Sequence, residues 1–444
     1  LPEKKEKKYH YPVLKLELSD YPVFESRERY DYASSLYPRT TAVETDIYEI
    51  ITGHIGVYLG IDIGSTSTKA VLLDNERRVL AGFYTRTSGR PIEAVQAIFE
   101  GIDDLARKKN ITFTVLGAGT TGSGRKFIGE IIGADVALDE ITAHARAACE
   151  LDPAVDTIIE IGGQDAKFTT MKNGMVTFSI MNNVCAAGTG SFIEEQAKKL
   201  GCPLDEYSQR AERAPAPLSS DRCTVFMERD LNYYVSQGYS VDEMLASVLH
   251  SVRENYLSKV AIEKSIGERI FFQGATAKNR ALIAAFEQRL GKRIAVSKYC
   301  HLTGALGVAL YLLEENASRT RFKGVGIYRN PIPVKSEVCE LCTNHCKIRV
   351  AEVNGETVAF GFLCGRDYDT EKFVASDKGF DLLARRKRIF SFDKQRTADG
   401  GPVVGIPAAL HLFDEMPLWQ KFFDLLNIKT VTSETCKKIG RAHV

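Results

Sequence analysis

Apolar residues gather in short runs that end at glycine-rich turns, a pattern typical of strands in a buried sheet. One run, Val57 to Ile63, is followed by the small polar residues Gly64 to Thr68 and by a second apolar run, Ala70 to Leu73. We therefore predict a β-hairpin with a compact tip. Thr157 to Ile161 is another strand-like run, and a pair of glycines follows it directly. Because glycine lets the backbone approach a ligand closely, both turns are candidate phosphate sites.

A third segment combines the strand and helix periodicities. Arg269 to Phe272 is a strand-like run, and Gly274 after it permits close approach of the backbone. Apolar residues then recur at helical spacing from Lys278 to Leu290, with Gly291 as the expected C-cap. Another strand begins at Ile294 to Val296. The segment predicts a strand-turn-helix-strand unit of an α/β fold.

A reactive cysteine is a candidate in the Gly/Ala-rich loop before another predicted helix. The helix begins near Ser191, which forms an S-x-x-E capping box with Glu194, and it ends at Gly201. Cys185 precedes it, and the helix N-terminus favours a thiolate there. The alternative is a small buried cysteine without chemical function.

The C-terminal third contains a cysteine cluster. Apolar alternation in Ile348 to Val353 and Thr357 to Leu363, with a turn at Asn354 and Gly355, predicts a hairpin that brings distant cysteines together. Four thiolates at fixed separation suit either Zn²⁺ or a four-cysteine iron–sulfur cluster. The predicted ligands are Cys339, Cys342, Cys346 and Cys364.

The last part of the chain predicts the start of a parallel α/β domain. Val403 to Ile406 reads as a strand, the apolar residues around Trp419 as a helix, and Thr430 to Thr432 as a second strand. We expect this piece to be poorly stable alone.

Composition and charge exclude several classes of protein. The chain has 444 residues, of which 44% are hydrophobic, so it can bury the cores of two or three domains. The 58 basic and 57 acidic residues provide no net field for nucleic acid or anionic membranes. Its longest apolar runs, such as Ala305 to Leu313, are too short to cross a bilayer. Ten cysteines without a signal peptide favour metal ligation or free thiols, so we expect a reducing, cytoplasmic location.

Carboxylates beside the two glycine-rich turns suggest a divalent cation. Asp62 lies inside an apolar strand and Asp165 follows the second turn, where hydrated Mg²⁺ of a nucleotide takes few protein ligands. Lys69 adds positive charge, but the GxxxxGK(S/T) arrangement of a P-loop is absent. The alternative for Asp62 is a paired aspartate of a hairpin.

The ordered motifs GIDIGSTSTK, EIGGQDAKF, FFQGATAKN and TGALGVAL resemble those of the superfamily of acetate and sugar kinases, heat-shock chaperones and actin. That resemblance implies an α/β fold with two ribonuclease-H-like lobes and ATP between them. Relatives usually have two glycines where Gln273 and Gly274 stand.

The resemblance assigns residues to three parts of the nucleotide site. The first phosphate site takes Asp62, Gly64, Ser65, Thr66, Ser67 and Lys69, the second takes Gly162, Gly163, Gln164 and Asp165, and the adenosine site takes Gly274, Lys278 and Asn279. Asp62, Asp165 and Gln164 are the implied catalytic residues, which order Mg²⁺ and the water that attacks the γ-phosphate.

The motifs CAAGTGSF, IGGQDAK and GAGTTGSGRKFIG narrow the resemblance to the BadF/BadG/BcrA/BcrD and 2-hydroxyglutaryl-CoA dehydratase activator family, from about Val57 to Leu313. The family implies two subunits that share one four-iron, four-sulfur (4Fe-4S) cluster and use ATP to pass an electron to a partner enzyme. Cys185 matches one cluster ligand, whereas Ala143 stands at the position of the other.

Long fused activators of this family suggest a domain plan. Residues 1–56 resemble an interdomain connector, 57–318 the ATPase domain, 319–378 a Cys-rich metal segment and 379–438 a truncated α/β domain similar to dehydratase subunits. Residues 439–444 resemble a translated sequencing adapter. We expect a fragment that forms a homodimer, or a pseudo-dimer with a second ATPase domain.

The preferred function is an ATP-dependent iron–sulfur electron donor for a 2-hydroxyacyl-CoA dehydratase or a similar reductase. One alternative is a small-molecule kinase of the N-acetylglucosamine type on the same fold. Another is a nucleotide-dependent regulatory module without turnover, which the Gln273 and Ala143 departures keep open.

Overall fold

The computed structural model describes residues 7–182, 186–315, 319–340, 345–353, 355–360, 402–407 and 412–432. The chain divides into two compact units, one made of Leu1–Val338 with Lys347–Phe362 and the other of Cys339–Cys346 with Leu363–Val444. Within the described ranges, no helix combines the length and apolar composition that a membrane crossing requires.

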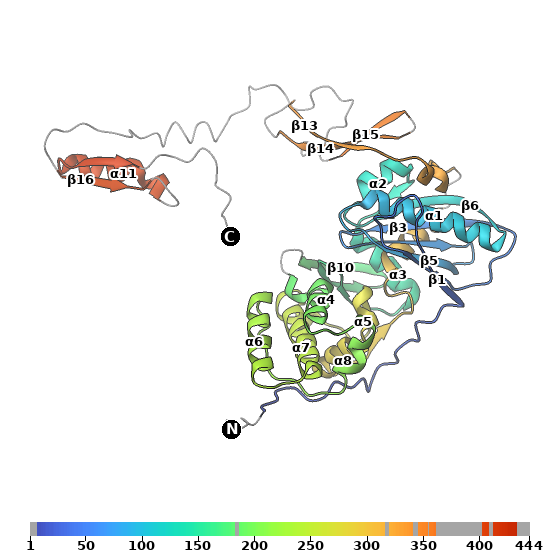
Figure 1. Ribbon diagram of the computed structural model, residues 1–444, viewed down its shortest axis with the longest axis horizontal. Helices are drawn as coiled ribbons and strands as arrows, with labels where there is room; N and C mark the ends of the chain where they lie inside the picture. The colour runs from blue at the N-terminus through green and yellow to red at the C-terminus, as the bar shows by residue number, and fades with distance from the viewer. Residues whose placement is uncertain are drawn as a thin grey trace. The chain divides into compact units, whose positions relative to one another are not determined.

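The first unit contains a seven-stranded sheet that forms the first lobe (Figure 1). Its order is β1-β2-β5-β4-β3-β6-β7. The pairs β1-β2, β2-β5, β5-β4 and β4-β3 are antiparallel. The pairs β3-β6 and β6-β7 are parallel. The strands are β1 (Glu28–Tyr32), β2 (Val43–Ile47), β3 (His54–Ile63), β4 (Ser67–Leu73), β5 (Val79–Arg86), β6 (Thr112–Thr121) and β7 (Val136–Ala137).

The second lobe is built on a five-stranded sheet in the order β10-β9-β8-β11-β12. Three consecutive strands pair antiparallel, and β11 and β12 then add in parallel. This is the order and direction of β5-β4-β3-β6-β7 in the first lobe, so the two lobes repeat one topology. The strands are β8 (Thr157–Ile161), β9 (Ala166–Lys172), β10 (Met175–Asn182), β11 (Ile270–Gln273) and β12 (Ile294–Val296).

Nine α-helices of the described residues belong to the two lobes: α1 (Pro91–Lys109), α2 (Arg125–Ile132), α3 (Glu140–Leu151), α4 (Gly190–Lys199), α5 (Leu204–Ala211), α6 (Thr224–Ser236), α7 (Val241–Lys259), α8 (Arg280–Leu290) and α9 (Thr303–Glu315). Short 3₁₀ turns occur at Ala186–Gly188, Glu263–Ser265, Ala275–Lys278 and Val325–Arg329. Helix α3 leads from the first sheet into the second and packs on α9, which follows the second sheet and packs on β3 and β6. The mixed α/β class is confirmed.

Residues before the predicted ATPase domain are integrated into both lobes. Strands β1 and β2 extend the first sheet beyond β5. Leu14 is buried in the core of the second lobe together with Phe272 and Phe286. Residues 1–56 were predicted to be an interdomain connector from the resemblance to fused activators, and within them β2 pairs with β5, which offers an edge that a further strand can join.

The two C-terminal patterns form the predicted strands. In the first unit, β14 (Lys347–Val353) and β15 (Glu356–Phe360) make the expected hairpin, and β13 (Val334–Val338) pairs with β14 on its other side. In the second unit, β16 (Val403–Ile406) and β17 (Lys429–Thr432) pair in parallel, with α11 (Leu412–Leu425) between them in sequence.

Local signals predicted most helix ends correctly, with one error. Gly291 ends α8 in the left-handed conformation, at φ 63°, as expected. The capping box at Ser191 is wrong, because α4 begins at Gly190 without a side-chain cap. The first amides of α4 instead bond to the second hairpin, Gly190 N to Gly162 O at 2.8 Å and Ser191 N to Gly163 O at 2.9 Å. Glu194 reaches across to Arg86 of the first lobe.

The crossing of α3 and α9 requires glycine at one position. A Cβ on Gly307 would lie 1.8 Å from the carbonyl oxygen of Ala143, and backbone atoms cannot yield as a side chain can. We expect Gly307→Ala to lower the free energy of unfolding by about 2–3 kcal/mol, measured by urea denaturation. Gly101→Ala in α1 is the matched control, because its Cβ would meet only side chains at 3.6 Å or more, and it should be neutral or stabilising. Equal effects of the two substitutions would contradict the close crossing.

Candidate functional site

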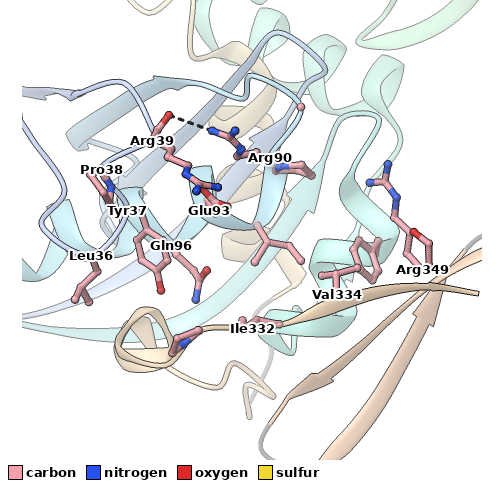
Figure 2. Close-up of a pocket in the computed structure, with 16 residues that line it drawn as sticks. Leu36, Tyr37, Pro38, Arg39, Arg90, Glu93, Gln96, Ile332, Val334 and Arg349 are labelled. Carbon is pink, nitrogen blue, oxygen red and sulfur yellow. Dashed lines mark hydrogen bonds between the residues drawn. The ribbon is translucent and has the colours of Figure 1, made fainter.

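A cavity of about 590 Å³ lies at the N-terminus of α1 (Figure 2). Its wall includes Tyr37, Arg90, Gln96 and Arg349, and Arg90 donates a hydrogen bond of 3.5 Å to the backbone of Arg39. None of the predicted phosphate or adenosine residues lines it. The predicted site therefore has to be built from the hairpin tips.

The tips of the β3-β4 and β8-β9 hairpins have the same turn. Gly64 N donates to Ser67 O at 3.0 Å, and Gly162 N donates to Asp165 O at 2.9 Å. The tips also approach each other, because a Cβ on Gly163 would lie 2.2 Å from Thr66 Oγ1. The structure thus brings the two predicted phosphate loops together at the junction of the lobes.

The other predicted residues of the two tips are either exposed to solvent or held within the hairpin. Ser65 and Gln164 are exposed at the tips. Thr66 accepts a hydrogen bond of 2.9 Å from the Thr87 amide, and Ser67 is buried at the start of β4. The exposed tip side chains are therefore free to meet a ligand.

Each hairpin carries a carboxylate and a lysine directly opposite each other. Asp62 pairs with Lys69 across β3 and β4, with Lys69 Nζ 3.1 Å from Asp62 Oδ2. Glu160 pairs with Lys167 across β8 and β9 at 2.8 Å. We missed Glu160 and Lys167 as site residues, although DIGSTSTK and EIGGQDAK have the same spacing of acid, glycine and lysine.

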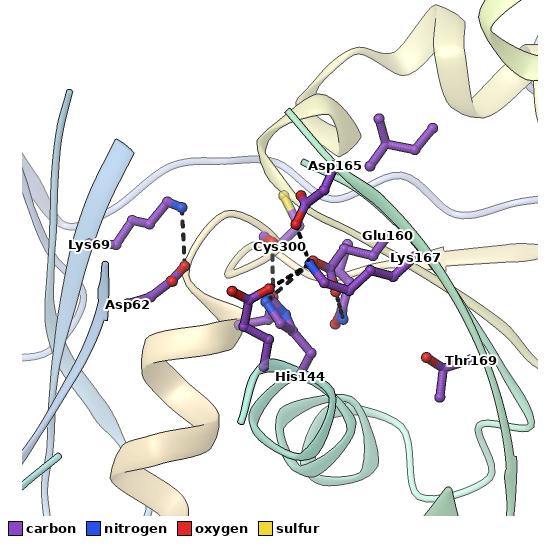
Figure 3. Close-up of polar contacts among 12 residues, drawn as sticks. Asp62, Lys69, His144, Glu160, Asp165, Lys167, Thr169 and Cys300 are labelled. Carbon is purple, nitrogen blue, oxygen red and sulfur yellow. Dashed lines mark hydrogen bonds and ion pairs between the residues drawn. The ribbon is translucent and has the colours of Figure 1, made fainter. Parts of the chain in front are cut away.

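Lys167 lies at the centre of an acidic cluster (Figure 3). Its Nζ is 2.8 Å from Glu160 Oε1, 3.0 Å from Asp165 Oδ2 and 2.9 Å from Glu140 Oε2. The Lys167 side chain is 4% exposed and that of Asp165 is 29% exposed. Asp165 is therefore held on one side by the lysine while it remains partly accessible to solvent.

Charge compensation outweighs burial in both pairs. Burial alone would raise the pKa of Glu160, but His144 and Lys167 lower it to about 2. Burial alone would likewise lower the pKa of Lys69 and Lys167, but Asp62 raises the first and Glu160 the second. Glu160, Lys69 and Lys167 are thus charged at neutral pH, and Asp62 lies in contact with Lys69.

His144 connects the acidic clusters to the helices between the lobes. Its Nε2 lies 3.4 Å from Glu160 Oε1, and its Nδ1 lies 3.0 Å from Thr303 Oγ1 at the start of α9. A Cβ on Gly304 would lie 3.1 Å from Asp62 Cγ and 3.2 Å from His144 Nε2. Helices α3 and α9 therefore contact the carboxylates of both hairpins.

The predicted adenosine residues form a turn at the end of β11. Gly274 has a φ of 96°, and a Cβ there would lie 2.4 Å from Ile161 O, so glycine is required. Asn279 caps α8, because its Oδ1 accepts a hydrogen bond of 3.1 Å from the Leu282 amide. Lys278 lies with its Nζ 6.0 Å from the centre of the Phe24 ring.

Gln273 stands where the motif of relatives usually has a glycine, and its contacts account for this departure. Its side chain is fully buried, and Nε2 donates to Glu160 Oε2 at 3.2 Å. Its Oε1 has no hydrogen-bond partner among the described residues. The side chain therefore belongs to the Glu160 cluster and does not fill the adenosine turn.

The predicted metal ligands lie largely outside the described residues, namely Cys185, Cys342 and Cys364. Cys339 and Cys346 are buried, and the Cys339 amide donates to Cys346 O at 2.9 Å. In the described ranges no three His, Cys, Asp or Glu side chains are placed to hold a metal ion. The metal sites therefore remain predictions.

Comparison with known proteins identifies the lobes. A model of the BadF/BadG/BcrA/BcrD ATPase family matches residues 59–311. The chain belongs to this family. Membership supports ATP binding and ATPase activity, and the matched range includes the tips of both hairpins, the predicted adenosine turn, α3 and most of α9. Residues 7–58, which contribute β1, β2 and the buried Leu14, precede the matched range.

Three relatives in this group are activators of acyl-CoA dehydratases. The (R)-2-hydroxyglutaryl-CoA dehydratase activating ATPase of Acidaminococcus fermentans is 32% identical over 58% of this chain and 98% of that protein. The activator of lactoyl-CoA dehydratase of Anaerotignum propionicum is 36% identical over 58% of this chain and 97% of that protein. The solved activator of the 2-hydroxyisocaproyl-CoA dehydratase from Clostridium difficile with bound ADPNP has a TM-score of 0.51 and 29% identity, and the match covers 59% of this chain and 95% of that one.

The low pKa of Glu160 predicts that the domain matched by the family model loses stability at acidic pH. Because the folded pKa is about 2 and the ordinary value is 4.5, the stability from Glu160 is present above pH 4.5 and is lost as the pH falls towards 2. We expect thermal melting to show that the free energy of unfolding falls by an amount on the order of 3 kcal/mol across this pH window. The fall should be smaller in Glu160→Gln. Glu268→Gln, at a side chain that is 81% exposed, should follow the wild type. Parallel curves for Glu160→Gln and the wild type would contradict the assignment.

Proposed function

We propose that this chain is an ATP-hydrolysing activator that donates low-potential electrons to a 2-hydroxyacyl-CoA dehydratase or a similar reductase. The observation that carries the proposal is the facing pair of hairpin tips, each with a lysine-held carboxylate and each in contact with an interlobe helix. The names of the relatives supply the class of partner enzyme.

The residues present fit a magnesium nucleotide. No described carboxylate pairs with Lys278, and the buried Nδ1 of His301 lacks a hydrogen-bond partner in the described part of the chain. Burial lowers the pKa of His301 first, and the neighbouring Lys278 and Lys69 lower it further. Lys278 would balance part of the charge of a polyanion, while the neutral His301 ring offers a nitrogen for a hydrogen bond.

The chain's own carboxylates supply positioning for hydrolysis. Asp62 and Glu160 stand on opposite hairpins, while Asp165 is the more accessible member of the Lys167 cluster. Magnesium when bound would neutralise phosphate charge. Fixed carboxylates would hold its water ligands and orient the water that attacks the γ-phosphate, so the rate gain comes from positioning and charge stabilisation.

Helices α3 and α9 provide the route by which the nucleotide could change the conformation of the lobes. His144 on α3 contacts Glu160, and Gly304 on α9 lies against Asp62. A change in the separation of the two tips must therefore shift the helix crossing at Gly307 and Ala143, where no side chain separates the backbones. This coupling is what an ATP-driven activator requires.

The described residues do not fit a cluster held by two cysteines of one chain. Ala143, at the second family position, is fully buried on α3 and has no thiolate. We propose Cys185 as the ligand that this chain offers, with the others supplied by a second copy or by a second ATPase domain in a pseudo-dimer. The cysteines of the 339–364 segment are proposed to hold Zn²⁺ or a separate iron–sulfur cluster.

The hydrolysis proposal is tested at the first hairpin. We expect Asp62→Asn to lower kcat for ATP hydrolysis by about 100-fold while the protein remains folded, because the carboxylate that orders magnesium and water is lost. The control is Asp205→Asn, an exposed residue in the first turn of α5, which should keep wild-type turnover. Wild-type protein that phosphorylates an added sugar, or that binds ATP without turnover, would overturn the proposed function.

The cluster proposal is tested by metal content and does not need the partner enzyme. Anaerobically purified protein should contain iron and labile sulfide and should absorb visible light. Cys185→Ala should lose the iron, sulfide and absorbance that belong to the cluster bound by Cys185. Cys149→Ala, which removes a half-buried thiol on α3, is the control and should keep the wild-type content. Equal iron content in the wild type and Cys185→Ala would remove Cys185 from this role.

A further inference from the structure

The residues from Lys7 to Phe24 are physically part of the second lobe. The Glu287 carboxylate on α8 accepts hydrogen bonds from three consecutive amides of this segment, namely Glu17 at 2.7 Å, Leu18 at 2.9 Å and Ser19 at 2.7 Å. Burial alone would raise the pKa of Glu287, but the Ser19 side chain and the three amides lower it, so the carboxylate stays charged and holds the segment. Leu14 is 1% exposed in the same core.

The next residues belong to the first lobe. Ser26 Oγ donates to Asp46 Oδ1 on β2 at 2.7 Å, and the Arg27 amide donates to Ile47 O at 2.8 Å. Strand β1 then continues along β2. The chain therefore crosses between the lobes at Glu25, in addition to the crossings made by α3 and α9.

This third crossing lies at the adenosine turn. The Tyr21 hydroxyl donates a hydrogen bond of 2.7 Å to Ala277 O, within the Ala275–Lys278 turn. The Tyr21 and Phe24 rings meet edge to face at 5.5 Å, and the Phe24 ring is the one that Lys278 approaches. The position of Lys278 is thus supported by residues that precede the family-matched range 59–311.

The charges near Lys278 come from both lobes. Burial lowers the pKa of Lys278, while Cys300 and the carboxylates Asp46 and Glu44 of β2 act to raise it. Glu44 is itself paired with Arg29 of β1 at 2.6 Å. The turn therefore faces the strands that the N-terminal segment adds to the first sheet.

We propose that Tyr21 and Phe24 are positioning residues of the nucleotide site, and that the crossing at Glu25 is a tether that slows nucleotide release. This inference rests on the proposed ATP-dependent function. The five peptide units from Tyr21 to Ser26 span at most about 18 Å when extended, so the adenosine turn and β2 can separate only as far as this length allows. Release of a nucleotide that requires wider opening must first break the contacts of Tyr21 or Ser26.

The positioning role is tested by removing one hydroxyl. Tyr21→Phe keeps the ring but deletes the bond to Ala277 O, and we expect the dissociation rate of a fluorescent ATP analogue to rise roughly three- to tenfold in stopped-flow experiments. The matched control is Tyr9→Phe, which deletes a hydroxyl bonded to Glu243 in the same segment, away from the turn. Its dissociation rate should equal that of the wild type.

The tether is tested by lengthening it without removing a contact. Insertion of Gly-Ser-Gly after Glu25 should speed dissociation of the analogue by a similar factor and, in nucleotide-free protein, raise amide hydrogen exchange in the Ala275–Lys278 turn. The same insertion between Asn173 and Gly174, in the exposed β9-β10 turn, should change neither quantity. Melting temperatures of all variants establish that they are folded.

The outcomes separate the two proposals. If the wild type binds the analogue but both changes leave its dissociation rate and the exchange of the turn unchanged, the tether is overturned and the ATPase proposal stands. If only the control variants release the analogue faster, the tether is also overturned. If the wild type binds no ATP analogue at all, the proposed function fails and the inference fails with it.

Discussion

The structure depends on two lysine-held carboxylates that are repeated at the tips of two hairpins. A buried carboxylate or ammonium is costly alone, and each becomes tolerable because its partner lies directly opposite on the neighbouring strand. Lys167 extends this arrangement by serving three carboxylates at once. The result is a pair of tips at the junction of the lobes, each with an acid–lysine pair, where glycine at 163 allows the second tip to reach Thr66.

The helices between the lobes connect the two hairpin tips to the rest of the domain. Helix α3 brings His144 to Glu160, and α9 brings Gly304 to Asp62, while Gly307 lets the two helix backbones touch at Ala143. A continuous series of close contacts therefore runs from the tips to the helix crossing. The N-terminal segment adds a third connection between the same lobes on the adenosine side.

Several elements were predictable because their signals are local. The apolar run before the paired glycines became β8, and the helical spacing before Gly291 became α8 with the expected left-handed cap. The capping box at Ser191 failed because the amides of α4 found acceptors on the second hairpin, which is distant in sequence. Strands β1 and β2 were missed for a related reason, since their pairing depends on an edge offered by β5.

The sequence by itself determined the two hairpins, the strand-turn-helix unit from β11 to α8 and the family of the lobes, because short-range glycine, strand and helix patterns encode them. It contained the repeated spacing of Asp62 with Lys69 and Glu160 with Lys167, but not which groups would be neighbours in space. Only the tertiary structure decided that Gln273 bonds to Glu160, that His144 joins the hairpins to α3, and that Tyr21 supports the adenosine turn. Those contacts join residues more than a hundred positions apart or on different strands and helices, so they exist only once the sheets and helices have packed.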